Sequence, residues 1–194
     1  MTLHERRKAM ARWLGRVVVG GVVLMLLGAG VPRALAGQRF FTEAGVGAGL
    51  MCDIDLPGDR LWGATLTGQL ARQLWKEPAR VDLRLEGVVT RYWGKDGAWL
   101  GGATVGLRLY NRPQAPAVFA EAAIGPSWNN LDIEEIGSSF NFLSFGGIGL
   151  RLEMDEQQML DIALRVRHIS NAGMTERNHG LTSVWVVVSW GWGL

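Results

Sequence analysis

The stretch Leu160-Asp161-Ile162-Ala163-Leu164-Arg165-Val166-Arg167-His168-Ile169-Ser170-Asn171 decides the fold of this chain. Its even-numbered positions are apolar and end in His168 and Ser170. Its odd-numbered positions carry the charges: Asp161, Arg165 and Arg167. Because successive side chains of a β-strand point to opposite faces, this alternation predicts a strand with one apolar and one charged face. His168 and Ser170 share the apolar face with Cα atoms about 6.6 Å apart, so a His–Ser hydrogen bond is within reach. A nucleophile and base on the apolar face suggest an enzyme with a lipid substrate.

The first 36 residues have the layout of a secretory signal peptide. Basic residues come first: Arg6, Arg7, Lys8, Arg12 and Arg16. Residues 17–30 form an apolar run that is too short and too rich in glycine for a comfortable membrane span, and residues 34–36 (Ala-Leu-Ala) provide a cleavage signal. We therefore expect export from a bacterium, with residues 1–36 removed and a single mature domain over residues 37–194. An uncleaved amphipathic anchor is the alternative interpretation.

The positive charge of the whole chain belongs to this leader. Residues 1–36 hold six of the 20 basic residues and one of the 18 acidic residues, so the remainder carries 14 basic and 17 acidic side chains, a net charge of −3. With no basic stripe and no nucleic-acid motif, we expect no nucleic-acid partner. Cys52 is the single cysteine, which excludes an intrachain disulfide, and we interpret it as a small buried or lipid-facing apolar residue.

After the leader, alternating stretches recur at the length of long, tilted barrel strands. They predict eight strands, over residues 40–52, 61–76, 80–93, 97–110, 116–127, 139–154, 157–170 and 181–194. An even number of antiparallel strands suits an all-β, up-and-down β-barrel.

Two kinds of barrel fit this pattern: a soluble lipocalin-like barrel with its apolar face inside, and a transmembrane barrel with its apolar face outside. Lysine, which is common on solvated surfaces, occurs after the leader only at Lys76 and Lys95. Most other charges lie at strand centres, among them Glu86, Glu121, Arg151 and Asp161. Arginines and carboxylates in such places suit a structural network inside a narrow lumen. This favours the transmembrane barrel.

Aromatic residues and loop lengths also favour a membrane location. One group of aromatics at strand ends comprises Trp62, Trp93, Trp99 and Trp128, and a second comprises Trp75, Tyr110, Trp190 and Trp192, as expected of two interfacial girdles. Connections near residues 77–79 and 155–156 are tight, whereas those near 53–60, 128–138 and 171–180 are longer. Outer-membrane barrels have short periplasmic turns and longer outer loops. With both termini periplasmic, His168 and Ser170 are expected at the outer rim, facing a leaflet that is mainly lipopolysaccharide.

The segment Arg167-His168-Ile169-Ser170-Asn171-Ala172-Gly173, followed by Asn178-His179-Gly180, resembles the lipid A 3-O-deacylase (PagL-type) family. Members of that family are eight-stranded outer-membrane barrels that hydrolyse the ester-linked acyl chain at the 3-position of lipid A. Their motif is His-x-Ser-Asn-x-Gly at the end of the penultimate strand. The resemblance implies Ser170 as nucleophile and His168 as general base, then acid for the leaving alcohol. It also implies an oxyanion site formed by Asn171 and a backbone N–H near Gly173.

The sequence departs from the family at the acid that orients the histidine. Alignment of the motif without gaps places Thr182 at that position, and threonine accepts a hydrogen bond from imidazole but does not stabilise imidazolium as a carboxylate does. Glu176, in the preceding loop, is a substitute acid only if the loop folds back. The sequence therefore predicts a Ser–His dyad or an incomplete triad. We expect no cofactor and no metal, because an ester needs only an activated hydroxyl, a base and an oxyanion site. His179, in a polar loop, is not expected to be catalytic.

Other functions fit the same residues. His168 is also compatible with a rim residue at the lipid interface, with Ser170 and Asn171 opening a turn, as these residue types often do. The chain would then be a non-catalytic structural or interaction barrel. A third hypothesis keeps the esterase and replaces lipid A with phospholipid. A homodimer is compatible with all three.

Overall fold

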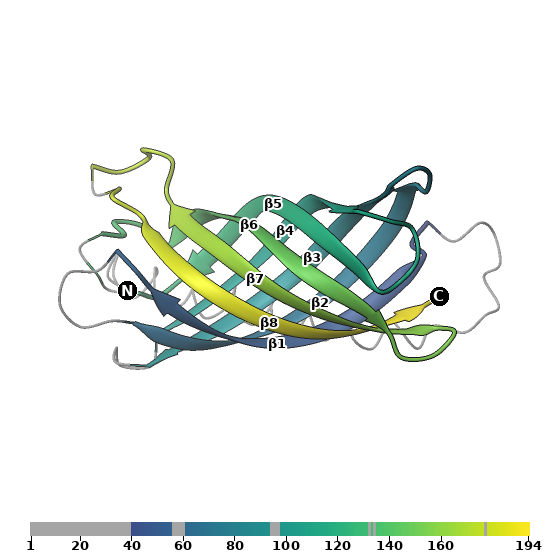
Figure 1. The fold of residues 1–194 in the computed structure, drawn as a ribbon. Coiled ribbons are helices and arrows are strands. Elements are labelled where there is room, and N and C mark those ends of the chain that lie inside the picture. The colour runs from purple at the N-terminus through teal and green to yellow at the C-terminus, as the bar shows by residue number, and fades with distance from the viewer. Residues whose placement is uncertain (1–39, 56–60, 94–97, 132, 134, 177) are drawn as a thin grey trace.

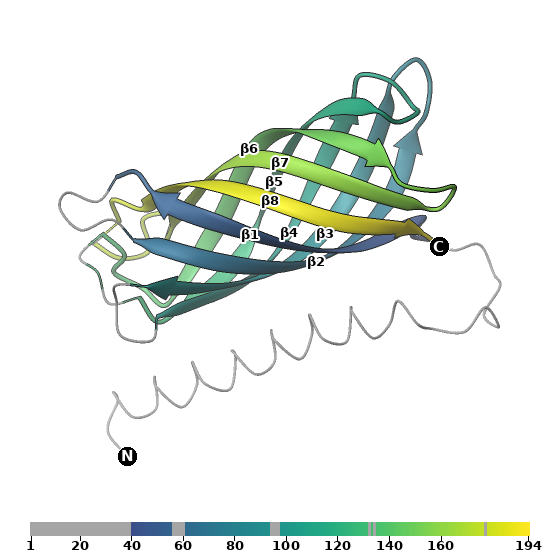
Figure 2. The ribbon, with the colours of Figure 1, turned by 60° about the horizontal axis from the view of Figure 1, so that its bottom comes forward.

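Eight antiparallel strands close into one barrel in the computed structural model, which describes residues 40–55, 61–93, 98–131, 133, 135–176 and 178–194 (Figure 1). The strands are β1 (Glu43–Asp53), β2 (Trp62–Trp75), β3 (Arg80–Trp93), β4 (Trp99–Tyr110), β5 (Ala117–Asn129), β6 (Phe140–Glu153), β7 (Gln158–Ser170) and β8 (Leu181–Gly193). Each strand pairs with the next, and β8 pairs with β1 along the seam visible in Figure 2. The predicted barrel is confirmed, with strand ends within three residues of those expected from the sequence. The expected leader, residues 1–36, lies outside the described residues.

The apolar face of every strand points outward. Leu66 on β2, Ile148 on β6 and Leu164 on β7 are 63%, 62% and 50% exposed, respectively. Arg165, which follows Leu164 on β7, and Glu121 on β5 face the lumen and are buried. An apolar outer face and a charged interior are what a barrel needs when lipid hydrocarbon surrounds it. The transmembrane arrangement is therefore confirmed, and the soluble lipocalin-like arrangement is not. The described residues contain no helix that is long and apolar enough to cross a membrane.

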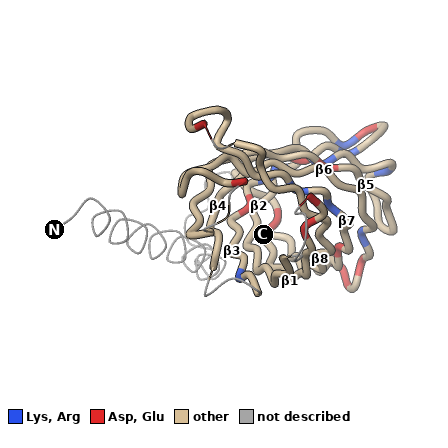
Figure 3. Tube along the Cα trace, turned by 90° about the vertical axis from the view of Figure 1, so that its left-hand side faces the viewer, with Lys and Arg blue, Asp and Glu red and all other residues tan. Residues whose placement is uncertain are grey.

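Ion pairs fill the lumen at the height of the strand centres. The Arg165 guanidinium donates from Nη1 to Glu86 at 2.7 Å and from Nε to Glu121 at 2.6 Å. Arg108 donates to Glu121 at 2.8 Å and also pairs with Asp161. Further pairs continue toward the chain termini through Arg151, Glu43, Arg80 and Asp82. Figure 3, seen from the longer-loop end, shows these charges distributed around the strands. The structural network expected from the sequence is confirmed.

An apolar cluster fills the lumen above this network. Its strand residues include Tyr92, Leu100, Leu143, Ile169 and Trp185, each at most 1% exposed. Residues 131, 133 and 136 of the β5–β6 connection add Leu and Ile side chains from above. The connection between β5 and β6 therefore closes the mouth of the barrel with side chains that belong to its core.

The two ends of the barrel differ in the length of their connections. Residues 76–79, 111–116 and 154–157 form the turns at one end, where the Leu194 N–H donates to the Thr42 carbonyl and the described part of the chain begins and ends. Residues 54–61, 94–98, 130–139 and 171–180 connect strands at the other end. Trp62 and Trp93 face each other across β2 and β3 at this second end and are about half exposed.

Tyr110 does not belong to the lipid-facing aromatic girdle in which the sequence analysis placed it. It shares the inward face of β4 with Arg108 and is 1% exposed. The guanidinium carbons of Arg80 and Arg151 lie 5.0 and 4.9 Å from its ring centroid. The position at a strand end suggested a girdle residue, but the alternation of β4 directs Tyr110 into the charged lumen, where its ring packs against cations.

Candidate active site

His168 lies one residue pair from the end of β7 at the longer-loop end of the barrel. It shares the outward face with Val166 and Ser170, as the alternation of the sequence predicted. In the pairing register, Ser144 of β6 stands opposite His168 on one side and Thr182 of β8 on the other. These three polar side chains form a row across the otherwise apolar outer face.

The imidazole of His168 is hydrogen-bonded to Thr182, the residue at which the alignment placed the orienting group. Its Nδ1 lies 3.1 Å from the Thr182 hydroxyl oxygen. Nδ1 is therefore engaged, and Nε2 is the ring nitrogen that remains for a nucleophile. Within the described residues the Ser170 hydroxyl forms no hydrogen bond to His168, so the two side chains share a face without a mutual hydrogen bond.

Asn171, directly after β7, organises the turn that follows Ser170. It is 1% exposed, and its Oδ1 accepts the Gly173 N–H at 3.0 Å while its Nδ2 donates to Thr175 at 2.6 Å. Ala172 and Gly173 both have positive φ, 54° and 79°. The predicted oxyanion groups are thus brought together beside Ser170, where they also hold the turn in shape.

Gly180 packs directly on the imidazole of His168. Its φ is 77°, and a Cβ built on it would lie 2.5 Å from Cε1 and 2.8 Å from Nε2 of His168. Real Cβ atoms do not approach this closely, so only glycine leaves room for the ring. The sequence motif includes Gly180, but the sequence alone gives no indication of this contact.

The neighbouring β5–β6 connection holds the 171–180 loop in place. The Gly180 N–H donates to the Glu135 carbonyl at 3.2 Å, and Ile136 forms an isolated β-bridge with Asn178. The Asn178 side chain in turn accepts the Asn171 N–H at 2.8 Å. The β5–β6 connection, anchored in the apolar cluster, therefore supports the loop that carries Asn171 and Gly173.

The main chain of Thr182 is held from the other side, by residues that follow β1. The Ile54 N–H donates to the Thr182 carbonyl at 2.9 Å, and the Thr182 N–H donates to the Asp55 carboxylate at 2.9 Å. Asp55 is 127 positions from Thr182 in the chain. Sequence reasoning did not single out Asp55, because nothing local to it indicates the contact.

Comparison with known proteins identifies the family of this chain. A family model described as lipid A 3-O-deacylase (PagL) matches residues 61–191. The chain belongs to the lipid A 3-O-deacylase family. It is therefore assigned to the hydrolases that deacylate lipid A, as the resemblance in the sequence indicated. No curated protein sequence matches the chain.

Solved structures share the fold of this deacylase. The crystal structure of the outer membrane enzyme PagL superposes with a TM-score of 0.61 at 20% sequence identity, covering 76% of this chain and 97% of that one. Neisserial surface protein A gives a TM-score of 0.55 at 13% identity and covers 81% of this chain and 99% of that one. At such identities these likenesses concern the fold, which is that of an eight-stranded outer-membrane barrel.

The other acid candidate of the deacylase is placed away from the imidazole contacts. Glu176 is exposed on the 171–180 loop, and in the described part of the chain no hydrogen bond or ion pair joins it to His168. His179 is exposed on the same loop. Thr182, in contrast, occupies the position that the alignment gave it and contacts His168 there.

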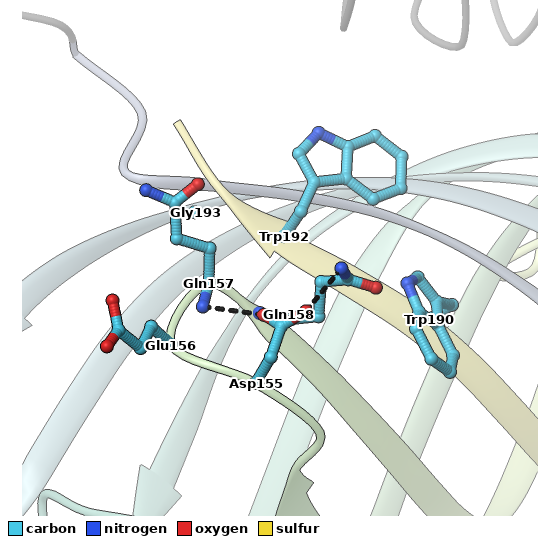
Figure 4. A pocket seen from close by; sticks show the side chains of 7 residues that line it. All are labelled: Asp155, Glu156, Gln157, Gln158, Trp190, Trp192 and Gly193. Atoms are coloured by element: carbon cyan, nitrogen blue, oxygen red, sulfur yellow. Dashed lines mark hydrogen bonds between the residues drawn. The ribbon is translucent and has the colours of Figure 1, made fainter.

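A large surface hollow of the deacylase lies at the opposite end of β7 and β8 from His168. It measures about 660 Å³ and is lined by the 155–158 turn with Trp190, Trp192 and Gly193 (Figure 4). Asp155 accepts hydrogen bonds from the Gln157 and Gln158 backbone N–H groups there. The length of the strands separates this hollow from the row formed by Ser144, His168 and Thr182.

Proposed function

We propose that this deacylase hydrolyses the ester-linked 3-hydroxyacyl chain at the 3-position of lipid A through a Ser170–His168 pair at the outer rim of the barrel. The observation that carries the proposal is the His168–Thr182 hydrogen bond. It fixes Nδ1 and leaves Nε2 of a lipid-facing imidazole for a serine two residues away on the same face. The family match supports the substrate class.

The chemistry follows from the roles of the two side chains. The Ser170 hydroxyl attacks the ester carbonyl while His168 Nε2 takes its proton, and the tetrahedral intermediate then expels the sugar alcohol, which receives that proton. Water, deprotonated by the same nitrogen, releases the acid from the acyl-serine. A rotation of the Ser170 side chain brings its oxygen toward the imidazole, since catalytic hydrogen bonds often tighten only with substrate bound.

The oxyanion site is formed by the turn after β7. The Asn171 amide nitrogen donates to the Thr175 hydroxyl, and the Gly173 N–H donates to Asn171 Oδ1. These donors belong to a compact turn at the nucleophile, where preorganised N–H groups stabilise developing negative charge. Substrate binding is expected to exchange the internal Gly173–Asn171 bond for one to the oxyanion.

The active site faces the outer leaflet in this proposal, and the chain crosses the membrane with all eight strands. Support comes from the end at which His168 lies, which carries the longer connections, while the short turns and Leu194 lie at the other. Short turns mark the periplasmic side of outer-membrane barrels. Lipid A in the outer leaflet then meets His168 from the surrounding membrane, without entering the lumen.

The decisive experiment is mass spectrometry of lipid A from cells that produce the protein. The intact chain should remove one 3-hydroxyacyl group, and Ser170→Ala or His168→Ala should reduce the rate by at least about 10³-fold because the nucleophile or its base is lost. Ser139→Ala, an exposed serine at the same end, is the matched control and should leave activity unchanged.

Barrel assembly is checked by the heat-dependent shift on gels, which all variants should retain. Unchanged lipid A in cells that contain assembled intact protein would contradict the proposal. Release of fatty acid from purified phospholipid, without release from purified lipid A, would instead assign the esterase to phospholipid.

A further inference from the structure

We propose that Asp55 is a positioning residue for His168, acting through Thr182 to supply the negative charge that the threonine lacks. This inference rests on the proposed roles of Ser170 and His168. It assigns a function to a residue that lies beyond the end of β1 and outside the catalytic motif.

The geometry joins Asp55 to the imidazole by two hydrogen bonds. The Asp55 carboxylate accepts the Thr182 N–H at 2.9 Å, and the Thr182 hydroxyl oxygen lies 3.1 Å from His168 Nδ1. Since the nitrogen and hydroxyl oxygen of one threonine are about 3 Å apart, the carboxylate lies no more than about 9 Å from Nδ1. A pair of short contacts thus links an anion to the base.

The Asp55–Thr182 contact takes the place of a backbone hydrogen bond between β1 and β8. Past the Asp53–Ser183 pair, the Ile54 N–H still donates to the Thr182 carbonyl. The reciprocal Thr182 N–H, however, donates to the Asp55 side chain rather than to a strand carbonyl. A carboxylate in this place anchors the backbone of Thr182, and with it the hydroxyl that orients His168.

Charge is the second contribution. His168 becomes imidazolium in both halves of the reaction, and a neutral threonine gives that cation little stabilisation. Ser144 and Thr182 flank the ring on β6 and β8, and both are uncharged. Glu176 and His179 are exposed on the 171–180 loop, and Glu135 contributes its carbonyl to Gly180.

Among the described residues, Asp55 is the carboxylate hydrogen-bonded to Thr182. Asp55 is exposed at this end of the barrel, so its charge acts on the imidazolium over a range comparable to the screening length and more weakly at high salt.

An isosteric substitution separates the effect of the Asp55 charge from the effect of its hydrogen bond to the Thr182 N–H. Asp55→Asn keeps an oxygen that accepts the Thr182 N–H but removes the charge. We expect kcat on purified lipid A to fall about tenfold, with KM nearly unchanged, as for loss of a unit charge at this separation. Asp55→Ala removes the anchor as well and should lower kcat further. Glu156→Gln, an exposed carboxylate in the turn at the other end, is the matched control and should retain full activity.

Rescue distinguishes this role from a purely structural one. Thr182→Glu places a carboxylate directly beside His168, so in the Asp55→Asn background it should restore kcat above that of Asp55→Asn alone. Wild-type kcat in Asp55→Asn would overturn the inference. So would a loss of kcat that Thr182→Glu does not restore.

The rate at which a fluorophosphonate labels Ser170 gives a readout that needs no lipid A. Wild-type labelling with no lipid A cleavage would refute the proposed substrate. The Asp55 inference would then still be decided by whether Asp55→Asn slows labelling about tenfold. Absence of both labelling and cleavage in the assembled wild-type barrel would overturn the two proposals together, whereas Ser170-dependent activity that ignores Asp55→Asn would overturn only the positioning role.

Discussion

Gly180 illustrates how much a single residue contributes to the catalytic geometry. Replacing Gly180 with alanine places a methyl group 2.5 Å from His168 Cε1 at a φ of 77° that alanine tolerates poorly. The imidazole must then move and its Thr182 hydrogen bond must lengthen. We expect kcat for lipid A to fall about 10²-fold, since a misplacement of about 1 Å costs this much.

Gly191→Ala on β8 is the control, because a Cβ there meets its nearest atom, the Ala44 carbonyl oxygen of β1, at an ordinary 3.4 Å. Full activity in Gly180→Ala would show that the imidazole does not need its observed place.

At this same scale, the sequence predicted where the candidate site residues lie but not the contacts that support them. The alternation of β7 placed His168 and Ser170 on the outer face, and the ungapped motif placed Thr182 beside the imidazole, as the structure has it. Asp55 was not predicted, because its contact joins residues 127 positions apart across the barrel seam. The fit of Gly180 against the ring was not predicted either, since such a contact depends on three-dimensional packing that no local pattern encodes.

At the scale of one strand, β7 carries both the lipid-facing site and a buried cation. Arg165→Met removes the guanidinium that pairs with Glu86 and Glu121 and leaves both carboxylates without that partner. Breaking a buried pair in this way costs about 3–5 kcal/mol, so the free energy of unfolding should fall by this amount in urea titrations in lipid vesicles.

Arg72→Met, at a half-buried arginine whose guanidinium lies over the Phe40 ring, should cost much less. Equal stabilities of the two variants would show that the lumen network contributes little to β7.

Strand alternation also explains what was and was not predictable about the elements. It gave the eight strands and their outward faces, because a membrane barrel must alternate apolar and polar residues along every strand. The same alternation indicates that Tyr110 points inward, because it lies two residues after the inward-facing Arg108. The assignment to a girdle relied on the strand end alone, where aromatic residues occur on both faces.

For the whole molecule, the filled lumen predicts a barrel that does not conduct. Arg165, Arg108 and their carboxylates occupy one level, and the cluster around Trp185 occupies the level above it. Purified protein in planar lipid bilayers should therefore give no current steps above those of a protein-free bilayer. Regular steps would show that the barrel contains an open water path and that lipid A chemistry is not its sole use of the membrane.

The seam between β1 and β8 has a consequence for when the enzyme begins to act. His168 on β7 is oriented by Thr182 on β8, and Thr182 is gripped by Ile54 and Asp55, which follow β1. The first and last strands of the barrel, β1 and β8, must therefore pair before the His168 imidazole is oriented in this way. Under the proposed mechanism, we expect a chain that is still in transit, or inserted with β1 and β8 unpaired, to be inactive toward the lipids that it meets. The first lipid A molecule cleaved would then report that the barrel has closed.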